Sequence, residues 1–400
     1  MDYSSLAQKY NTPLYIYDFD KIALRYSELK QAFSGRKSLV CYAVKANSNL
    51  SLLKFLASLG AGFDCVSVGE IKRALIAGAK PYQMIFSGVG KRDDEIKYAL
   101  TNDILMINLE SEAELERVEN IAKELQKVAR ISIRVNPDVD ANTHPYISTG
   151  LNENKFGVDM DTAKKMYIKA KKSDNLQPIG IHFHIGSQIT DISSIIQASG
   201  IVSKLLAELK SIDIDIKFFD IGGGIGIVYN DERDVSLYDY AQGILKNLSG
   251  HDMTIVCEPG RFLVGNAGEF LTKVLYEKTN KNKRFVVVDG AMNDLLRPSL
   301  YNAYHRISVV GKDKNHTSCD VVGPICESGD FLAKKINLPI CESGDLIVVK
   351  SAGAYGFSMS SNYNTRPRVA EVAIINNKDK LIRKRESFDD VIALEKECLE

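Results

Sequence analysis

The sequence of 400 residues predicts an α/β protein, in which a (β/α)8 barrel is followed by a second, all-β domain. Eight short apolar runs lie between residues 37 and 260, and amphipathic stretches with apolar residues at spacings of three and four separate them. Strand alternating with helix eight times is the pattern of a parallel barrel, whose catalytic groups follow the strands at one face. Beyond residue 270, β-rich segments with turn residues between them predict the second domain.

The barrel is expected within residues 26–270. Its eight predicted strands are SLVCYAV (38–44), GFDCVSV (62–68), MIFSG (84–88), ILMINL (104–109), RISIRV (130–135), IGIHFHI (179–185), KFFDIGGG (217–224) and TIVCEPG (254–260). Helix-like segments between them include EIKRALIAGA (70–79), SEAELERVENIAKELQKVA (111–129) and DTAKKMYIKAKKS (161–173).

The second domain is expected to comprise residues 1–25 and 271–400. The segment PLYIYD near the N-terminus precedes the first barrel strand, so we expect it to join the second domain as a strand. Near the C-terminus, NNKDK predicts a hairpin turn. The other predicted strands are FVVVDG (285–290), RISVVGK (306–312), SCDVVG (318–323), DLIVVKSAGAYG (345–356) and RVAEVAIINNKDKLI (368–382).

Composition fits an enzyme that acts on small molecules, as it fits most other soluble globular proteins. Lysine plus arginine and aspartate plus glutamate both number 51, so a zero net charge gives no support for a nucleic-acid or membrane partner. No apolar stretch approaches the roughly 18 residues of a membrane span, and we expect no signal peptide. The seven cysteines form no CxxC pair. We therefore expect no metal site and reduced thiols in a cytoplasmic protein.

Lys45 in YAVKANSN (42–49) directly follows a predicted strand. Most lysines are solvated surface charges. Here the apolar neighbours Val44 and Ala46 favour partial desolvation, which lowers the pKa of an amine and makes it nucleophilic, as a Schiff-base lysine requires.

The histidines of IHFHIGSQ (181–188) are a second candidate. In a strand, His182 and His184 point to one face and Phe183 to the other. A metal pair is the competing interpretation, but the sequence offers no evident third ligand. A flat imidazole can instead stack on a flat cofactor ring.

Glycines and charged groups follow the last two predicted barrel strands. Glycine runs usually mark tight turns, but DIGGGIG (220–226) follows strand seven, where barrels often bind phosphate. EPGR (258–261) offers Glu258 for a protonated ring nitrogen and Arg261 for an anion.

Together with CESGD and AYGFSMSSNYN, these motifs resemble the fold-type-III pyridoxal-phosphate decarboxylases over nearly the whole chain. The stretches VNPDVDANTHPYISTGLNENKFG (135–157), NDLLRPSLY (293–301) and VVGPICESGD (321–330) are similar to the branch that acts on meso-diaminopimelate. The resemblance implies decarboxylation to L-lysine by a homodimer, with the CESGD loop reaching the partner subunit's site.

The resemblance also implies residue roles. Lys45 is the Schiff-base lysine, His184 stacks on the cofactor ring, and Cys326 donates the proton after decarboxylation. Asp64 and Glu70 match supporting positions. The other implied cofactor contacts are Ser187, Gly222, Gly223, Gly224, Gly226, Glu258, Pro259, Gly260, Arg261 and Tyr355. The implied substrate contacts are Arg261, Arg297, Tyr301, Glu327 and Tyr355.

Substrate chemistry supports that branch. Decarboxylating one end of diaminopimelate requires holding the carboxylate and the ammonium of the other end. Arg297 and Arg261 suit a carboxylate, and Glu327 suits an ammonium. An ornithine, lysine or arginine decarboxylase is the nearer alternative, and a surface ion pair is the ordinary interpretation of Arg297.

The pentapeptide CESGD occurs twice, at 326–330 and 341–345. The first copy follows VVGP, as in the family, so we assign Cys326 as catalytic and Cys341 as structural.

Two more distant alternatives remain. Alanine racemase shares the barrel and an opening lysine motif, but it uses an arginine at the ring nitrogen, where EPGR supplies a glutamate. A non-catalytic homologue that binds a partner enzyme would tend to lose the lysine or the cysteine, and this chain keeps both.

Overall fold

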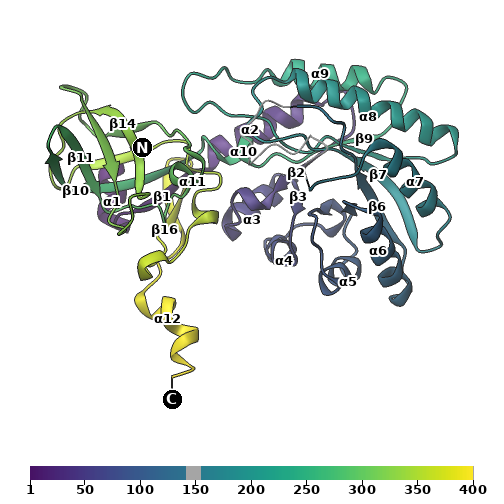
Figure 1. Ribbon diagram of the computed structural model, residues 1–400, viewed down its shortest axis with the longest axis horizontal. Helices are drawn as coiled ribbons and strands as arrows, with labels where there is room; N and C mark the ends of the chain where they lie inside the picture. The colour runs from purple at the N-terminus through teal and green to yellow at the C-terminus, as the bar shows by residue number, and fades with distance from the viewer. Residues whose placement is uncertain (141–154, 400) are drawn as a thin grey trace. The chain divides into compact units, whose positions relative to one another are not determined.

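Eight parallel strands close into a barrel, as the sequence pattern predicts, in the computed structural model (Figure 1), which describes residues 1–140 and 155–399. The strands are β2 (Ser38–Ala43), β3 (Gly62–Cys65), β4 (Met84–Phe86), β5 (Met106–Leu109), β6 (Ala129–Arg134), β7 (Leu176–His182), β8 (Phe218–Asp220) and β9 (Thr254–Cys257). Each predicted run contains or overlaps one of these strands, so the predicted barrel is confirmed.

Helices lie around the barrel strands (Figure 1). They are α2 (Phe19–Ala32), α3 (Leu50–Ser58), α4 (Val68–Ile76), α5 (Asp93–Thr101), α6 (Glu112–Glu124), α7 (Met160–Lys171), α8 (Ser193–Ser211), α9 (Leu237–Asn247) and α10 (Arg261–Val264).

Short polar side chains fix where several of these helices begin. Ser67 and Ser111 accept hydrogen bonds from backbone amides in the first turns of α4 and α6, and Asn49 does the same for α3. Each bond satisfies an amide that has no partner within its own helix. The loops between strand and helix are therefore held tightly, which fixes the side chains they carry.

Apolar side chains fill the barrel. One buried cluster joins Cys41 of β2, Ile85 of β4, Met106 of β5 and Val256 of β9, so strands distant in sequence meet in the centre. Because the strands are parallel, their C-terminal ends share one edge of the barrel.

A nine-stranded sheet forms the second part of the chain (Figure 1). Its main path runs β14-β13-β11-β10-β1-β16-β17, and β15 pairs with both β10 and β12. The bounds are β1 (Leu14–Asp18), β10 (Gly268–Asn280), β11 (Lys283–Val288), β12 (Ile307–Val309), β13 (Thr317–Val322), β14 (Phe331–Leu338), β15 (Leu346–Val349), β16 (Ala370–Ile375) and β17 (Lys378–Arg383).

The N-terminal strand lies inside this sheet. β1 pairs antiparallel with β10 and parallel with β16, which confirms that PLYIYD joins the second domain. The predicted hairpin is also present, because β16 and β17 pair on either side of Asn376 and Asn377, both of which have positive φ.

Among the described residues of this part, two strands and three short α-helices were not predicted. The helices are α1 (Tyr3–Tyr10), α11 (Arg297–Tyr301) and α12 (Phe388–Lys396). β10 is buried without interruption in its first five residues and mostly exposed in its second half, so its sequence does not alternate. β14 is interrupted at Lys335, which has a φ of 53°, and its register against β13 shifts. Neither strand therefore carries the period-two pattern that identified the others.

The chain separates into two compact units. The β-rich unit comprises Met1–Ile22, Val228–Glu232 and Val264–Glu400, and the barrel unit comprises Ala23–Ile227 and Arg233–Leu263. Within the described residues, no helix is both long enough and apolar enough to cross a membrane.

Candidate active site

Lys45 lies just beyond the end of β2, in the short 3-10 helix Val44–Ala46. Its Nζ is 3.9 Å from Oδ2 of Asp64, which is buried at the next strand. The Lys45 side chain is 45% exposed, so its apolar neighbours desolvate it only in part. The amine is thus held beside a carboxylate and open to a ligand.

The carboxyl groups around Lys45 are perturbed by burial. Burial, together with the carboxylate of Glu258, raises the pKa of Asp64 against the opposing effect of Lys45. Burial also raises the pKa of Glu70 to about 7, although its carboxylate accepts the Val66 amide at 2.8 Å. Glu70 lies in the first turn of α4, and its bond to the backbone fixes the loop after β3.

Three strands bring His182, Asp220 and Glu258 together. His182 ends β7, Asp220 ends β8 and Glu258 directly follows β9, and their ligand atoms all lie within 4.8 Å of one another. His182 Nε2 is 3.3 Å from Glu258 Oε2. The sequence spacing hides these two carboxyl groups, which the neighbouring strands β8 and β9 place beside His182.

The pKa values of Glu258 and Asp220 are shifted in opposite directions. Burial acts to raise the pKa of Glu258, but His182 and Lys45 outweigh it, and the pKa is lowered. Burial, and then the negative charge of Glu258, raises the pKa of Asp220 well above its usual range. Glu258 is therefore the member of the pair that ionises first, and Asp220 is the one that keeps its proton to higher pH. Asp220 Oδ1 accepts the Gly222 amide at 2.9 Å, and this bond joins the pair to the glycine loop, residues 222–226.

His184 lies beyond the end of its strand, because β7 ends at His182. The prediction that both histidines lie in one strand is therefore wrong for His184. Its Nδ1 accepts the Gly223 amide at 3.3 Å, and its carbonyl accepts from Nη2 of Arg134 at 3.3 Å. Burial, with Arg134 and Lys45, lowers its pKa well below the usual range, so the ring is neutral.

The glycine loop, residues 222–226, packs against the two neighbouring loops. A Cβ at Gly223 would lie 2.3 Å from the Glu258 carbonyl oxygen, and one at Gly224, whose φ is 104°, would lie 2.5 Å from that of Gly186. Only glycine fits both positions. The amides of Gly222, Gly223 and Gly226 already have acceptors within the protein.

The segment EPGR closes this edge of the barrel. The Pro259 carbonyl accepts the Ala43 amide at 3.1 Å, and a Cβ at Gly260 would lie 3.0 Å from that of Ala46. Arg261 is buried at the start of α10, and its Nη2 lies 3.3 Å from Ser187 Oγ. The turn therefore holds Glu258 and Arg261 close to the backbone of the lysine loop.

Arg134 and Glu110 belong to this site and were not predicted. Arg134 Nη1 lies 3.1 Å from Glu110 Oε1 and its guanidinium lies over the Phe156 ring, while Glu110 Oε2 accepts the Gly157 amide at 2.8 Å. Both side chains are almost fully buried. The available signal was position: Arg134 is the last residue of β6 and Glu110 directly follows β5, at the edge where catalytic groups are expected.

The remaining predicted residues belong to the β-rich unit. Arg297 begins α11 and is buried, and its Nη1 donates to the Tyr229 hydroxyl at 2.9 Å. Tyr301 ends the same helix. Tyr355 is half-buried, with a φ of 57°.

Cys326 and Glu327 are exposed and are held by one segment. The Cys326 amide donates to Asn364 Oδ1 at 3.3 Å, and the Tyr363 hydroxyl donates to Glu327 Oε2 at 2.8 Å. Cys341, in the second pentapeptide, is buried.

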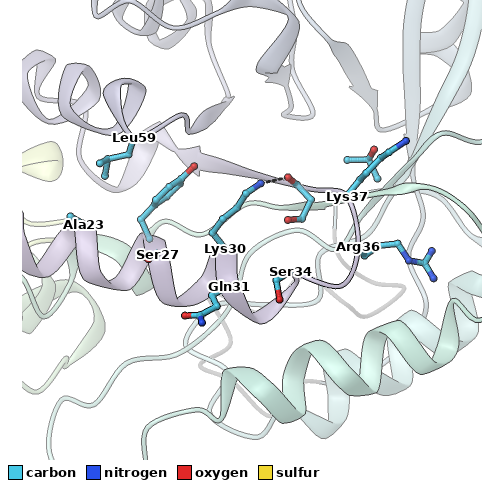
Figure 2. Close-up of a pocket in the computed structure, with 11 residues that line it drawn as sticks. Ala23, Ser27, Lys30, Gln31, Ser34, Arg36, Lys37 and Leu59 are labelled. Carbon is cyan, nitrogen blue, oxygen red and sulfur yellow. Dashed lines mark hydrogen bonds between the residues drawn. The ribbon is translucent and has the colours of Figure 1, made fainter.

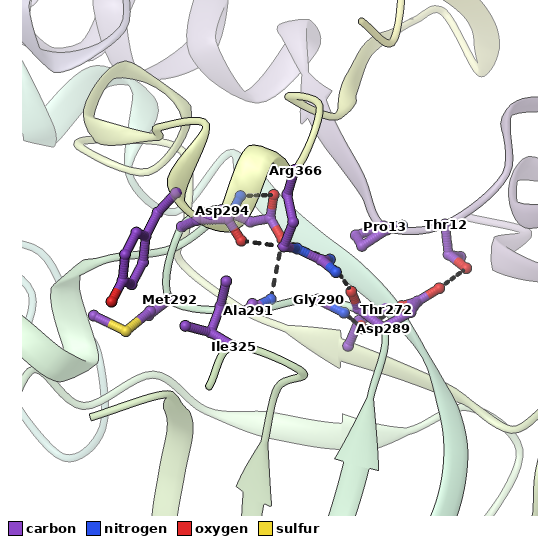
Figure 3. A network of polar contacts seen from close by, with 12 residues as sticks. Thr12, Pro13, Thr272, Asp289, Gly290, Ala291, Met292, Asp294, Ile325 and Arg366 are labelled. Atoms are coloured by element: carbon purple, nitrogen blue, oxygen red, sulfur yellow. Dashed lines mark hydrogen bonds and ion pairs between the residues drawn. The ribbon is translucent and has the colours of Figure 1, made fainter. Parts of the chain in front are cut away.

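A polar network supports the segment that carries Arg297 (Figure 3). Arg366 donates to the Asp289 carbonyl at 2.6 Å and to Asn293 Oδ1 at 3.1 Å, and Thr12 Oγ1 donates to Asp289 Oδ2 at 2.5 Å. Asp294 accepts the Ala291 amide at 3.0 Å. Burial raises the pKa of Asp294 to about 7 despite the nearby Arg366.

A separate cavity of about 770 Å³ in the barrel unit is not the predicted site (Figure 2). Lys30, Arg36 and Lys37 line it, and the Lys30 ammonium donates to the Ser38 carbonyl. Ser38 and Thr254 begin β2 and β9, so this cavity lies at the end of the barrel opposite the predicted residues.

Part of one motif lies outside the described residues. In the stretch 135–157, which resembles diaminopimelate-specific relatives, residues 141–154 are not described.

Comparison with known proteins identifies relatives over the full chain. Residues 19–265 match the pyridoxal-dependent decarboxylase family, pyridoxal binding domain. The chain is 63% identical over 400 residues, all of both chains, to the diaminopimelate decarboxylase of Campylobacter jejuni. It superimposes with a TM-score of 0.97 and 55% identity, again over all of both chains, on the crystal structure of the Helicobacter pylori diaminopimelate decarboxylase complexed with L-lysine. A lysine/ornithine decarboxylase of Vibrio vulnificus, complexed with putrescine, shares the fold at 22% identity and a TM-score of 0.83, covering 94% of this chain and 98% of that one.

Proposed function

Because the chain belongs to the pyridoxal-dependent decarboxylase family, we propose that it removes one carboxylate from meso-diaminopimelate and yields L-lysine and carbon dioxide, the last step of lysine biosynthesis. The observation that carries this proposal is full-length similarity to diaminopimelate decarboxylases at 55–63% identity. An ornithine-type substrate is the weaker candidate, because the lysine/ornithine enzyme is similar only in fold.

The barrel residues fit pyridoxal phosphate. The Lys45 amine lies beside Asp64 and is half-exposed, as a covalent anchor must be. Glu258 Oε1 is buried and, among the described residues, has no hydrogen-bond partner, so a protonated ring nitrogen would satisfy it. The half-buried, neutral His184 offers a flat ring for stacking.

The phosphate is assigned to the loops after β7, β8 and β9. Gly224, Ser187 and Arg261 supply an amide, a hydroxyl and a guanidinium, and Tyr355 is assigned to the same group. Amides in a glycine loop and a guanidinium are donors suited to phosphate. Gly222, Gly223 and Gly226 act by allowing close packing, because their amides are already bonded.

Each residue has a defined task in the reaction. Pyridoxal phosphate, when bound, supplies an electron sink for the bond that breaks at Cα. Glu258, the member of its pair that ionises first, favours a proton on the ring nitrogen, which strengthens that sink. Lys45 holds the cofactor between turnovers. The Cys326 thiol gives a proton to Cα after carbon dioxide has left.

The distal end of the substrate requires charges of both signs. Arg297 and Arg261 are assigned to the distal carboxylate and Glu327 to the distal ammonium, with Tyr301 and Tyr355 as further contacts. Arg297 is buried beside Tyr229, and its guanidinium presents a planar set of N–H donors of the kind that suits a carboxylate.

The active protein is proposed to be a cytoplasmic homodimer. In this assignment the loop that carries Cys326 and Glu327 reaches the partner subunit's barrel. Its support is the exposure of both residues, while the second copy of the same pentapeptide buries its cysteine.

A product assay tests the proposal. Purified holoenzyme is given meso-diaminopimelate, ornithine, lysine and arginine separately, together with Lys45→Ala, Cys326→Ala and the matched control Cys341→Ala. We expect lysine from diaminopimelate alone, loss of product in Lys45→Ala, a strong decrease in Cys326→Ala and near wild-type rates in Cys341→Ala. Turnover of ornithine in place of diaminopimelate would refute the substrate assignment. No turnover by folded, cofactor-loaded protein would favour a non-catalytic homologue.

A further inference from the structure

Two identical heptapeptides, PICESGD at 324–330 and 339–345, have opposite burial. In the first copy Ile325 is 6% exposed and Cys326 is exposed. In the second copy Ile340 is 51% exposed and Cys341 is 5% exposed. The seven residues themselves therefore do not decide which side chain faces solvent.

The aspartate that ends each copy bonds differently. Asp345 accepts the Glu342 amide at 2.7 Å and pairs with Lys312 at 2.7 Å, so it closes its own turn. Asp330 is 4% exposed: its Oδ2 accepts the Ile325 amide within its own copy, and its Oδ1 accepts the Met292 amide outside it, each at 2.7 Å. One carboxylate thus joins the first copy to the segment that leads to Arg297.

The residue before each copy accounts for this difference. A Cβ at Gly323 would lie 2.5 Å from Asp330 Oδ2 and 2.6 Å from the Gly290 carbonyl oxygen. The equivalent residue before the second copy is Leu338, whose side chain could not occupy that space. Figure 3 shows Ile325 beside Ala291 and Met292 in this crowded region.

Asp330 acts on Cys326 through the backbone. Because it holds the Ile325 amide, the Ile325 side chain is buried and the next side chain, Cys326, faces outward. Asn364 then holds the Cys326 amide, and the segment that contains Asn364 is itself tied to Asn293, since the Ser361 amide donates to the Asn293 carbonyl at 2.9 Å.

We propose that Asp330 is the positioning residue that presents the Cys326 thiol for proton transfer. Its carboxylate keeps the first copy in the arrangement that exposes Cys326, and prevents it from adopting the arrangement of the second copy, which buries its cysteine. The assignment rests on the proposed function, in which Cys326 is the proton donor. It predicts that the same substitution in the two copies has different consequences.

The first test is kinetic and uses the matched pair Asp330→Asn and Asp345→Asn in holoenzyme. Asp330→Asn should lower kcat at least 10-fold with less than a twofold change in KM, and Asp345→Asn should change kcat less than twofold. In a Cys326→Ala background, Asp330→Asn should lower kcat less than twofold further, because the thiol it positions is absent. Equal losses in both backgrounds would overturn the proposal by making Asp330 a general scaffold residue.

The second test does not depend on activity. Iodoacetamide labelling is followed by peptide mass spectrometry, with the exposed Cys398 as internal reference. Cys326 labelling relative to Cys398 should fall at least fivefold in Asp330→Asn and stay unchanged in Asp345→Asn. Labelling that is unchanged or faster in Asp330→Asn would overturn the proposal. Full activity of Cys326→Ala would instead refute the catalytic role of the cysteine, while labelling would still decide whether Asp330 sets its arrangement.

Thermal unfolding and pyridoxal absorbance show whether each variant is folded and loaded. If Asp330→Asn does not fold, Gly323→Ala replaces it, because the added Cβ would displace the Asp330 carboxylate. It should give the same loss of labelling, and unchanged labelling would again overturn the proposal.

Discussion

Replacing Asp294 by asparagine should make stability less sensitive to alkaline pH. Asp294 is 1% exposed, and burial raises its pKa from 3.8 to about 7. Its folded pKa therefore exceeds its unfolded pKa, so the folded state binds the extra proton between these values. The stability from this group is fully present below pH 3.8 and is lost as the pH rises through 7. Asparagine stays neutral and can still accept the Ala291 amide.

The size of the effect follows from the shift. Each pKa unit corresponds to about 1.4 kcal/mol, and roughly two units of the shift fall between pH 5 and pH 8.5. The free energy of unfolding of Asp294→Asn minus that of wild type should therefore rise by about 3 kcal/mol over this range. Any cost of fitting the amide group is constant with pH and cancels from this difference.

Urea unfolding of holoenzyme, followed by circular dichroism at pH 5.0, 7.0 and 8.5, measures the effect. The control is Tyr15→Phe, which removes a 2.8 Å hydrogen bond to the Asp294 carbonyl and should cost about 1 kcal/mol at each pH. A variant that becomes less stable relative to wild type as the pH rises would refute the reasoning, since the pairing of Asp294 with Arg366 would then outweigh burial.

Three further predictions concern the barrel. Glu258→Gln should keep the cofactor bound but lower kcat on the order of 100-fold, because the ring nitrogen loses its charged partner. Absorbance spectra measure cofactor binding and steady-state kinetics measure kcat, and a wild-type kcat would contradict the prediction. Gly223→Ala should weaken cofactor binding at least 10-fold in equilibrium titration, because its Cβ would lie 2.3 Å from the Glu258 carbonyl oxygen, and unchanged affinity would show that the loop relaxes. Arg134→Met should lower the free energy of unfolding by about 3–5 kcal/mol, because it leaves Glu110 buried without its partner, whereas Arg134→Met combined with Glu110→Gln should recover part of that loss.

The barrel was predictable because its signal is local. Each strand is a short apolar run, and each helix shows spacings of three and four within a dozen residues. β10 and β14 lack such a signal. The first half of β10 is buried and its second half is mostly exposed, and β14 is interrupted at Lys335, which has a positive φ. Their pairing depends on neighbours that are distant in sequence.

The candidate site was predictable only where motifs carried it. Lys45 and Glu258 lie in sequence motifs that indicate their proposed roles, and both lie at the expected edge of the barrel. The pairing of His182 with Glu258, and that of Arg134 with Glu110, joins residues from different strands. The pairing of neighbouring strands in the folded barrel, β5 with β6 and β7 with β8 with β9, brings these partners close together.

The interior position of β1 has a consequence for how the chain is made. Ile16 is synthesised well before its sheet partner Val372, which lies on a strand far later in the chain. At about 5–20 residues per second, β1 waits roughly 20–70 s for that neighbour. The barrel strands, all within Ser38–Cys257, are complete well before then. The strands of the sheet are therefore made in a fixed order, and a chaperone that shields β1 during translation would cover a strand edge that can otherwise pair with another chain.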